Sequence, residues 1–256
     1  MRCLRLTLAY DGTAYVGWQR QANGTSIQQL VETALAPFTP EALPPVTGAS
    51  RTDAGVHALG QVASVRVPFD HAADAIQRAL NIRLPPDVRV LSVDEAVPGF
   101  HARIDARGKR YRYRIATGSV VLPMDRWFVW HVPARLDVEA MREAARALTG
   151  AHDFAAFQAT GSSVVDTRRV IRRLDLVPAG DELHVEVEGD GFLRHMVRII
   201  AGSLVDVGSG SRSSAWLAGA LAGRDRRAAG RTAPASGLVL ERVFYDAPAP
   251  EPRAGQ

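Results

Sequence analysis

Hydrophobic and polar residues alternate at the start of the chain. Leucine or tyrosine occupies every second position from Leu4 to Tyr10, which predicts a strand with one buried face. A helix is predicted to begin after Ser26, because Ser26 and Gln29 have the spacing of a capping box and an apolar face follows them. The same two patterns predict strands at 63–67 and 88–92 and a helix at 75–80, and a short strand is expected to lead into the RTDAG turn.

The second half of the chain repeats this order of elements. Tyrosine and isoleucine alternate with arginine at 110–115, which predicts a strand, and a helix is predicted from about Asp137 to Gly150. Two segments rich in valine and leucine, 168–178 and 182–189, are separated by an Ala-Gly-Asp turn and predict a hairpin. The remaining predicted elements are helices at 192–208 and from Ser213 or Ser214, and a strand at 237–245.

The order of elements predicts the fold class. Each half reads as strand, helix, strand, strand, helix, strand, which is the order of a ferredoxin-like unit. We therefore predict an α+β protein in which two ferredoxin-like halves share a long, mainly antiparallel sheet, with helices on one face and an active-site cleft between the halves. The predicted boundaries are 1–105 for the N-terminal half, 106–246 for the C-terminal half and 247–256 for a disordered tail.

Composition narrows the class of protein. Hydrophobic residues make up 46% of the 256 positions, which is ordinary for a globular protein, and the longest apolar runs are far too short to cross a bilayer. The first ten residues lack the apolar core and the cleavage site of a secretion signal. Cys3 is the only cysteine, so the chain can form neither an internal disulfide nor a cysteine metal site. A cytoplasmic location is therefore expected.

The charge of the chain allows a nucleic-acid partner. The formal net charge is +4, the pI is about 9.7, and 30 of the 31 basic residues are arginines, with Lys109 as the exception. The planar guanidinium can pair with a phosphate or stack on a base. A GC-rich coding sequence also raises the arginine content, so the charge by itself does not decide between nucleic-acid binding and genome composition.

The segment ASRTDAGVHA, residues 49–58, contains the strongest candidate for chemistry. An aspartate before small residues is common in turns, where its side chain bonds nearby amides. Here Asp53 also has Arg51 two positions before it and His57 four positions after it. Small residues surround the acid and leave room for a bulky ligand close to the backbone. This combination favours a catalytic role for Asp53.

Two further segments supply candidate partners for this acid. Tyr111 comes at the start of its predicted strand, where an aromatic ring is placed to stack on an unpaired base, whereas Tyr113 is expected in the core. In the predicted helix 192–208, Arg194 and Arg198 are four residues apart on one flank. Arg198 is placed either to pair with a buried carboxylate and favour its ionised form, or to extend from the edge of the core to solvent.

Other kinds of site find little support in the sequence. The seven histidines do not have metal-ligand spacing, and the chain contains no dinucleotide-binding glycine motif, P-loop or nucleophile elbow. Two alternative functions stay open at this point. One is a non-catalytic RNA-binding or RNA-folding module, and the other is an aspartate-dependent hydrolase that uses Asp105 or Asp190 as a second carboxylate.

Four segments together resemble one known family. They are YDGTAYVGWQRQ, GASRTDAGVHALGQV, FHARIDARGKRYRYRI and GFLRHMVRIIAGSLVDVG, and in this order they closely resemble the TruA family of tRNA pseudouridine synthases. The resemblance runs from about Tyr10 to Val207 and is weaker up to the final strand. Ser50 departs from the family, which often has glycine before the RTD triplet, and this small side chain is expected to preserve activity.

The resemblance implies a reaction and a set of site residues. The implied reaction isomerises uridine to pseudouridine at positions 38, 39 and 40 of the tRNA anticodon stem-loop, needs no metal or organic cofactor, and is carried out by a homodimer. Asp53 matches the family's catalytic aspartate, and Tyr111 matches its base-stacking tyrosine. Arg51 matches the arginine beside the acid, and Arg198 matches the arginine that pairs with it.

Overall fold

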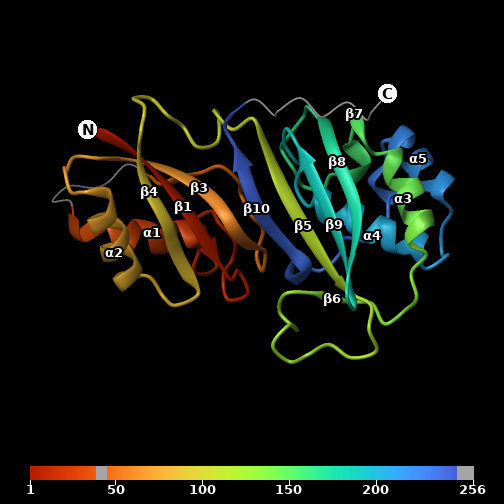
Figure 1. The fold of residues 1–256 in the computed structure, drawn as a ribbon. Helices are drawn as coiled ribbons and strands as arrows, with labels where there is room; N and C mark the ends of the chain where they lie inside the picture. Colours follow the sequence, from red (N-terminus) through yellow and green to blue (C-terminus); the bar gives the residue numbers. More distant parts are fainter. Residues whose placement is uncertain (39–44, 247–256) are drawn as a thin grey trace, which may run out of the picture.

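The computed structural model describes residues 1–38 and 45–246 (Figure 1). The predicted disordered tail, 247–256, lies outside these residues. Every element predicted for the first half is present, and most are longer than the pattern indicated. In chain order they are β1 (Arg2–Tyr10), α1 (Ile27–Leu35), β2 (Thr47–Gly48), β3 (His57–Val67), α2 (Ala73–Arg83) and β4 (Val88–Ala96).

Helix α1 begins where the capping pattern predicted. The Ser26 hydroxyl accepts a hydrogen bond from the Gln29 backbone N–H at 3.2 Å, which satisfies one of the free N–H groups of the first turn. The Ile27 N–H donates to the Gly17 carbonyl at 3.1 Å. The start of α1 thereby holds the preceding loop, which contributes to the site described below.

The second half also has the predicted order, with two additions. Its elements are β5 (Gly108–Ala116), β6 (Trp130–His131), α3 (Val138–Arg146), β7 (Gly150–Asp153), β8 (Arg168–Ala179), β9 (Glu182–Gly189), α4 (Met196–Gly208), α5 (Ser214–Gly223) and β10 (Leu238–Phe244). Strands β6 and β7 were not predicted, because strands this short show no readable alternation. Helix α3 ends at Arg146 rather than Gly150, since Gly150 has a φ of +108° and begins β7.

Helix α4 begins four residues later than predicted. His195 has a left-handed φ of +60°, which a right-handed helix cannot include, so residues 192–195 form a loop. The predicted placement of Arg194 and Arg198 on one flank of a helix was therefore wrong, because Arg194 precedes the helix. Within residues 1–38 and 45–246, no helix is both long and apolar enough to span a membrane.

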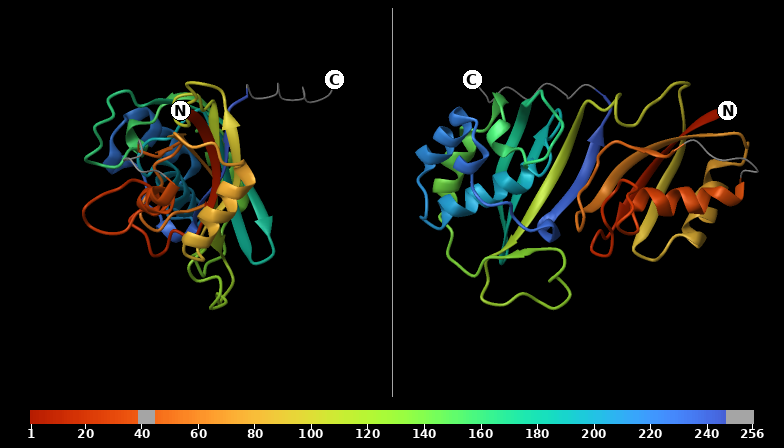
Figure 2. Two further views of the ribbon diagram at one scale, coloured as in Figure 1. Left: turned by 90° about the vertical axis from the view of Figure 1, so that its left-hand side faces the viewer. Right: turned by 180° about the vertical axis from the view of Figure 1, so that it is seen from behind.

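A single ten-stranded sheet joins the two halves. Its order is β4-β1-β3-β10-β5-β9-β8-β7, with β2 paired to β3 and β6 paired to β5. Among the described residues, the pairings are antiparallel except those of β10 with β3 and of β6 with β5. Figure 2 shows the helices on one face of this sheet. These observations confirm the α+β fold with a long, mainly antiparallel sheet, and place the last strand of the chain between the halves.

The hydrophobic core lies between the sheet and the helices. Alternate residues of β1 and β5 point into it, and Leu4, Leu6, Tyr113 and Ile115 are fully buried. The three arginines of β5 face the opposite side of the sheet, as the alternation predicted. This geometry places Tyr111 on the helix-covered face, where a pocket opens between the halves.

Candidate active site

A pocket of about 620 Å³ opens between the two halves of the sheet. The first half contributes residues 49–54, which include most of the RTDAG turn, and the second half contributes Tyr111 and residues 192–198. All four predicted site residues line this pocket: Arg51, Asp53, Tyr111 and Arg198. Residues that are far apart in the sequence therefore meet at the junction of the halves.

The turn that carries Asp53 is held by the loop before α1. The Trp18 N–H donates to the Thr52 carbonyl at 3.0 Å. Gly17 lies so close to this turn that an added Cβ would be 2.5 Å from the Thr52 carbonyl oxygen, and its φ of +100° also favours glycine. The Gly-Trp pair of the YDGTAYVGWQRQ segment thus supports the backbone on which Asp53 stands.

The Asp53 carboxylate has two nitrogen-bearing neighbours. Arg198 Nη1 lies 3.4 Å from Asp53 Oδ2, and His195 Nε2 lies 3.6 Å from the same oxygen. The Asp53 side chain is 25% exposed and the Arg198 side chain 15% exposed. A ligand can therefore reach the carboxylate, while the partial burial reduces the screening of its attraction to the guanidinium by water.

Arg198 is oriented by the backbone before β10. Its Nε donates to the Ala233 carbonyl at 2.8 Å, and the Ala233 N–H donates to the Arg198 carbonyl at 3.1 Å. The first bond holds one edge of the guanidinium and leaves Nη1 facing Asp53, and the second ties the Arg198 backbone to the same segment. The segment that leads into the last strand is thus part of the support of the site.

His195 is a site residue that the sequence did not reveal. Its imidazole faces Asp53 from the left-handed position just before α4. Burial lowers the pKa of His195, and nearby arginines add to this effect, while Asp53 opposes it. The ring is therefore neutral at pH 7. The sequence carries no signal for this placement, because the conformation of the loop decides where the ring points.

Tyr111 forms one wall of the pocket. Its hydroxyl lies 2.6 Å from the Ser50 hydroxyl, and its ring packs edge-on against Phe192 with 5.2 Å between the ring centroids. Gln61 holds the Ser50 backbone through hydrogen bonds to its N–H and carbonyl groups at 3.1 and 2.8 Å. Burial raises the pKa of Tyr111, so the hydroxyl stays protonated. Phe192 was not predicted as a site residue, because it fell inside an expected helix.

Arg51 lies at the rim of the pocket. Its side chain is exposed and, among the residues that the structure describes, it has no hydrogen-bond or ion-pair partner. Because its guanidinium has no carboxylate partner there, it is available to a ligand that enters the pocket.

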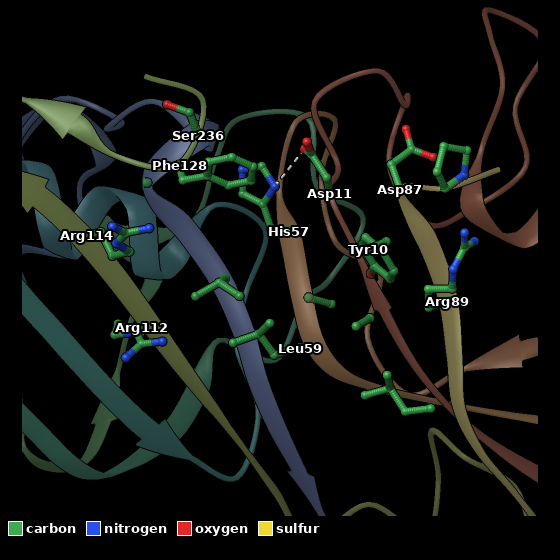
Figure 3. Close-up of a pocket in the computed structure, with 16 residues that line it drawn as sticks. Tyr10, Asp11, His57, Leu59, Asp87, Arg89, Arg112, Arg114, Phe128 and Ser236 are labelled. Atoms are coloured by element: carbon green, nitrogen blue, oxygen red, sulfur yellow. Dashed lines mark ion pairs between the residues drawn. The ribbon is translucent and has the colours of Figure 1, made fainter. Parts of the chain in front are cut away.

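His57 lies in a different pocket from Asp53, on the other side of the sheet. The pocket has a volume of about 440 Å³. His57 faces Asp11 there (Figure 3). Its Nδ1 accepts a hydrogen bond from the Gly12 N–H at 3.1 Å, and its Nε2 lies 2.9 Å from the Trp127 carbonyl oxygen. His57 is therefore not a partner of Asp53, although four positions separate them in the sequence.

The second-carboxylate candidates do not belong to the Asp53 pocket. Asp105 accepts a hydrogen bond from the His101 N–H at 2.8 Å, and Asp190 accepts one from the Val170 N–H at 3.0 Å. Neither aspartate lines the pocket between the halves. In the part of the chain that the structure describes, no group of three or more His, Cys, Asp or Glu side chains is arranged to hold a metal ion.

Known proteins match this chain over nearly its whole length. A family model described as tRNA pseudouridine synthase matches residues 7–104 and 144–246. A tRNA pseudouridine synthase A from Myxococcus xanthus is 49% identical over 243 residues, which make up 94% of this chain and 91% of that protein. A protein of the same name from Syntrophotalea carbinolica is 47% identical over 247 residues, 96% of this chain and 97% of that protein. Because these matches are extensive and at high identity, the chain belongs to the tRNA pseudouridine synthase family.

Proposed function

We propose that this protein isomerises uridine to pseudouridine at positions 38, 39 and 40 of the tRNA anticodon stem-loop, with Asp53 as the catalytic group. The observation that carries the proposal is the carboxylate of Asp53 in the pocket between the halves, 3.4 Å from the Arg198 guanidinium. A carboxylate that acts as a nucleophile or base must be ionised, and a guanidinium neighbour favours that form. The names of the relatives support tRNA as the substrate.

The proposed reaction rearranges one nucleotide without adding or removing atoms. The C1′–N1 bond of uridine breaks, the uracil turns, and a C1′–C5 bond forms, while C5 loses a proton and N1 gains one. A uridine in a stem is stacked and paired, so it must first be flipped out, at a cost of a few kcal/mol. In the proposed complex, Arg51 at the rim fills the vacated space and Tyr111 covers the flipped base.

Asp53 faces the sugar in this arrangement, and three roles are open to it. The carboxylate can attack C1′, attack C6, or remove a proton from C2′. All three roles need an ionised carboxylate at the same place, supported by Arg198. A single substitution of the acid therefore tests all of them together.

Asp53→Asn is expected to abolish pseudouridine formation and to leave tRNA binding within about tenfold, or about 1.4 kcal/mol. The amide keeps the shape of the side chain but cannot act as a nucleophile or base. Unmodified tRNA is incubated with each protein, and pseudouridine is mapped by carbodiimide-blocked reverse transcription. Turnover by the variant at the wild-type rate would contradict the proposal.

The same measurement separates the alternative functions. A non-catalytic tRNA-binding module would bind the RNA without forming pseudouridine in either protein. A hydrolase would release a product instead of rearranging a nucleotide, and its second carboxylate would have to lie within the same pocket. The pairing of Asp53 with Arg198 disfavours the first alternative, and the positions of Asp105 and Asp190 outside the pocket disfavour the second.

We propose further that the enzyme is a cytoplasmic homodimer that uses no metal or organic cofactor, and that residues 1–105 and 106–246 are its two halves. The family resemblance supports the homodimer and the reaction without a cofactor, the order of the elements supports the two halves, and tRNA as the substrate supports the location. The segment between β5 and β6 also presents hydrophobic side chains to solvent, which is typical of a contact surface. They are Val120, Leu122, Met124 and Trp127, between 48% and 77% exposed.

A further inference from the structure

Lys109 is the only lysine of the chain, and it lines the pocket that contains Asp53. It precedes Tyr111 by two positions in β5, so the two side chains leave the same face of the sheet about 7 Å apart along the strand. Its register partner in β9 is Gly189, which has no side chain to cover the lysine. Lys109 therefore stands next to the proposed base-binding wall.

The other cations of β5 have carboxylate partners on the opposite face of the sheet. The pairs are Arg110–Glu188 at 2.8 Å, Arg112–Glu241 at 3.0 Å and Arg114–Glu182 at 2.6 Å. Among the described residues, the Lys109 ammonium makes no hydrogen bond and no ion pair. One strand thus carries three neutralised arginines on one face and an unpaired lysine on the face that the substrate would occupy.

Most of the charges that face Lys109 are positive. Arg103, from the segment between β4 and β5, also lines the pocket. Arg169 of β8 adds a further positive charge, although its Nη1 donates to the Asp166 and Arg168 carbonyls and it does not line the pocket. Asp190 faces the lysine as well, but its Oδ1 already accepts a hydrogen bond from the Val170 N–H. Burial and the two arginines lower the pKa of Lys109 to about 8, while Asp190 opposes the shift. An anion would neutralise this excess of positive charge.

We propose that Lys109 and Arg103 form a phosphate site that holds the RNA backbone beside the nucleotide in the pocket. This proposal rests on the proposed function, because it assumes an RNA whose target base lies against Tyr111. Such a nucleotide carries a phosphate on each side of its sugar, and charge-assisted bonds to phosphate are stronger than neutral ones. Phosphate contacts set the register of a nucleic acid without reading its bases. The site therefore selects the position of the target nucleotide in the pocket.

Phosphate binding is expected to couple to the protonation of Lys109. An anion beside the ammonium favours its charged form, so the pKa of Lys109 rises in the complex. Free protein therefore takes up a proton on binding above about pH 8, and affinity for RNA falls as the pH rises through that range. An arginine at the same position would stay charged and remove this dependence.

Three proteins test the site: the wild type, Lys109→Arg and Lys109→Gln. Binding of unmodified tRNA is measured at low salt near pH 7 and near pH 9. We expect the wild type to bind about tenfold more weakly at the higher pH, and Lys109→Arg to bind equally well at both. We expect Lys109→Gln to bind about tenfold more weakly than the wild type at pH 7, with a slope of affinity against salt that is smaller by about one. Titration of the RNA bases affects all three proteins alike, so Lys109→Arg is the matched control.

Two results would overturn the phosphate site. In the first, the affinity of Lys109→Arg for tRNA falls with pH as steeply as that of the wild type. In the second, Lys109→Gln binds tRNA at pH 7 as tightly as the wild type does. Lys109→Gln removes a cation from a cationic cluster, so its unfolding temperature is expected to be no lower than that of the wild type. If it does not fold, the comparison of the wild type with Lys109→Arg still decides the question.

Mapping of pseudouridine in the same RNA keeps the two proposals apart. If the wild type forms no pseudouridine, the proposed function fails, whatever the binding results. If the wild type forms pseudouridine while its affinity depends on pH no more than that of Lys109→Arg, only the phosphate site fails.

Discussion

The hydroxyl of Ser50 holds Tyr111 in place at the pocket wall. The two hydroxyl oxygens are 2.6 Å apart, and Gln61 holds the Ser50 backbone from the other side. A glycine at this position would remove this partner of the buried tyrosine hydroxyl. Ser50 therefore restrains the ring that is proposed to cover the flipped base.

His57 has a structural role and is not a partner of Asp53. Its Nδ1 accepts the Gly12 N–H, so the neutral ring carries its proton on Nε2, next to the Trp127 carbonyl oxygen. The residue thereby ties the loop before α1 to the segment between β5 and β6. The bond to Gly12 depends on a neutral imidazole, because protonation of Nδ1 would remove this acceptor and direct the ring to Asp11 Oδ1, 3.1 Å away.

Acid is therefore expected to destabilise the protein through His57. Burial lowers its pKa, although Asp11 and the Trp127 carbonyl oppose the shift, so below about pH 6.5 the unfolded chain binds the proton more readily than the folded chain. The contribution of His57 to the free energy of unfolding is complete above pH 6.5. This contribution falls as the pH drops through the lower pKa that His57 has in the folded protein, by up to about 1.4 kcal/mol per pH unit.

His57→Gln keeps one donor and one acceptor but does not titrate, so it should lose this part of the acid dependence. Urea unfolding at about pH 7.5 and 5.5 measures the difference in free energy. His71→Gln is the control, because it makes the same change at an exposed histidine. Equal acid dependence of His57→Gln and the wild type would show that His57 is not responsible.

At the level of the elements, the loop before α1 and the turn that carries Asp53 form one unit. The loop is held by the start of α1 and contacts the turn through Gly17 and Trp18. The turn leads directly into β3. The position of the acid therefore depends on two connections that contain no regular structure, and both are rich in small residues because their backbones approach closely.

Gly17→Ala is expected to lower activity much more than Gly99→Ala. Both glycines have a left-handed φ, +100° and +88°, so both substitutions introduce a similar backbone strain of about 1 kcal/mol. A Cβ at position 17 would also lie 2.5 Å from the Thr52 carbonyl oxygen, whereas one at position 99 meets nothing within 4 Å. Only Gly17→Ala therefore displaces the turn that carries Asp53.

Initial rates of pseudouridine formation at saturating tRNA measure this effect. We expect a loss of about tenfold or more in kcat for Gly17→Ala and less than about twofold for Gly99→Ala, because small displacements of a reacting group cost large factors in rate. Equal rates for the two variants would mean that the contact between Gly17 and the turn does not position Asp53.

At the level of the whole molecule, β10 joins the two halves that together form the site. It pairs with β3, which follows the Asp53 turn, and with β5, which carries Tyr111 (Figure 1). The segment before β10 also orients Arg198 through Ala233. The last strand of the chain thus sets the spacing of the acid, the tyrosine and the guanidinium.

The proposed homodimer is expected to cover the exposed hydrophobic side chains between β5 and β6. Leu122→Asp and Met124→Asp would each place a charge in that contact and should weaken the dimer by about tenfold or more. Ile82→Asp is the matched control, because Ile82 is an exposed hydrophobic residue on α2. Sedimentation equilibrium should give about twice 27.6 kDa for the wild type and for Ile82→Asp. A monomeric wild type would contradict the proposed dimer. If only Ile82→Asp became monomeric, the segment between β5 and β6 would not be the dimer contact.

Local patterns predicted most of the elements, because alternation, helical periodicity and capping depend on residues close together in the chain. They missed β6 and β7, which are too short to show a period. They also extended the helix at 192–208 too far, since Phe192 and Leu193 continue its apolar pattern while His195 adopts a left-handed conformation. That conformation depends on the surroundings of the loop and leaves no mark in the sequence.

Residue patterns along the chain were enough to predict the order of the elements and to single out Arg51, Asp53, Tyr111 and Arg198, which the structure brings to one pocket. The other residues around them became known only from the folded arrangement. It separates His57 from Asp53 and adds His195 and Lys109 to the pocket. The physical reason is that these contacts cross between the halves, and pairing of distant strands through β10 is not encoded in any local pattern of hydrophobic and polar residues.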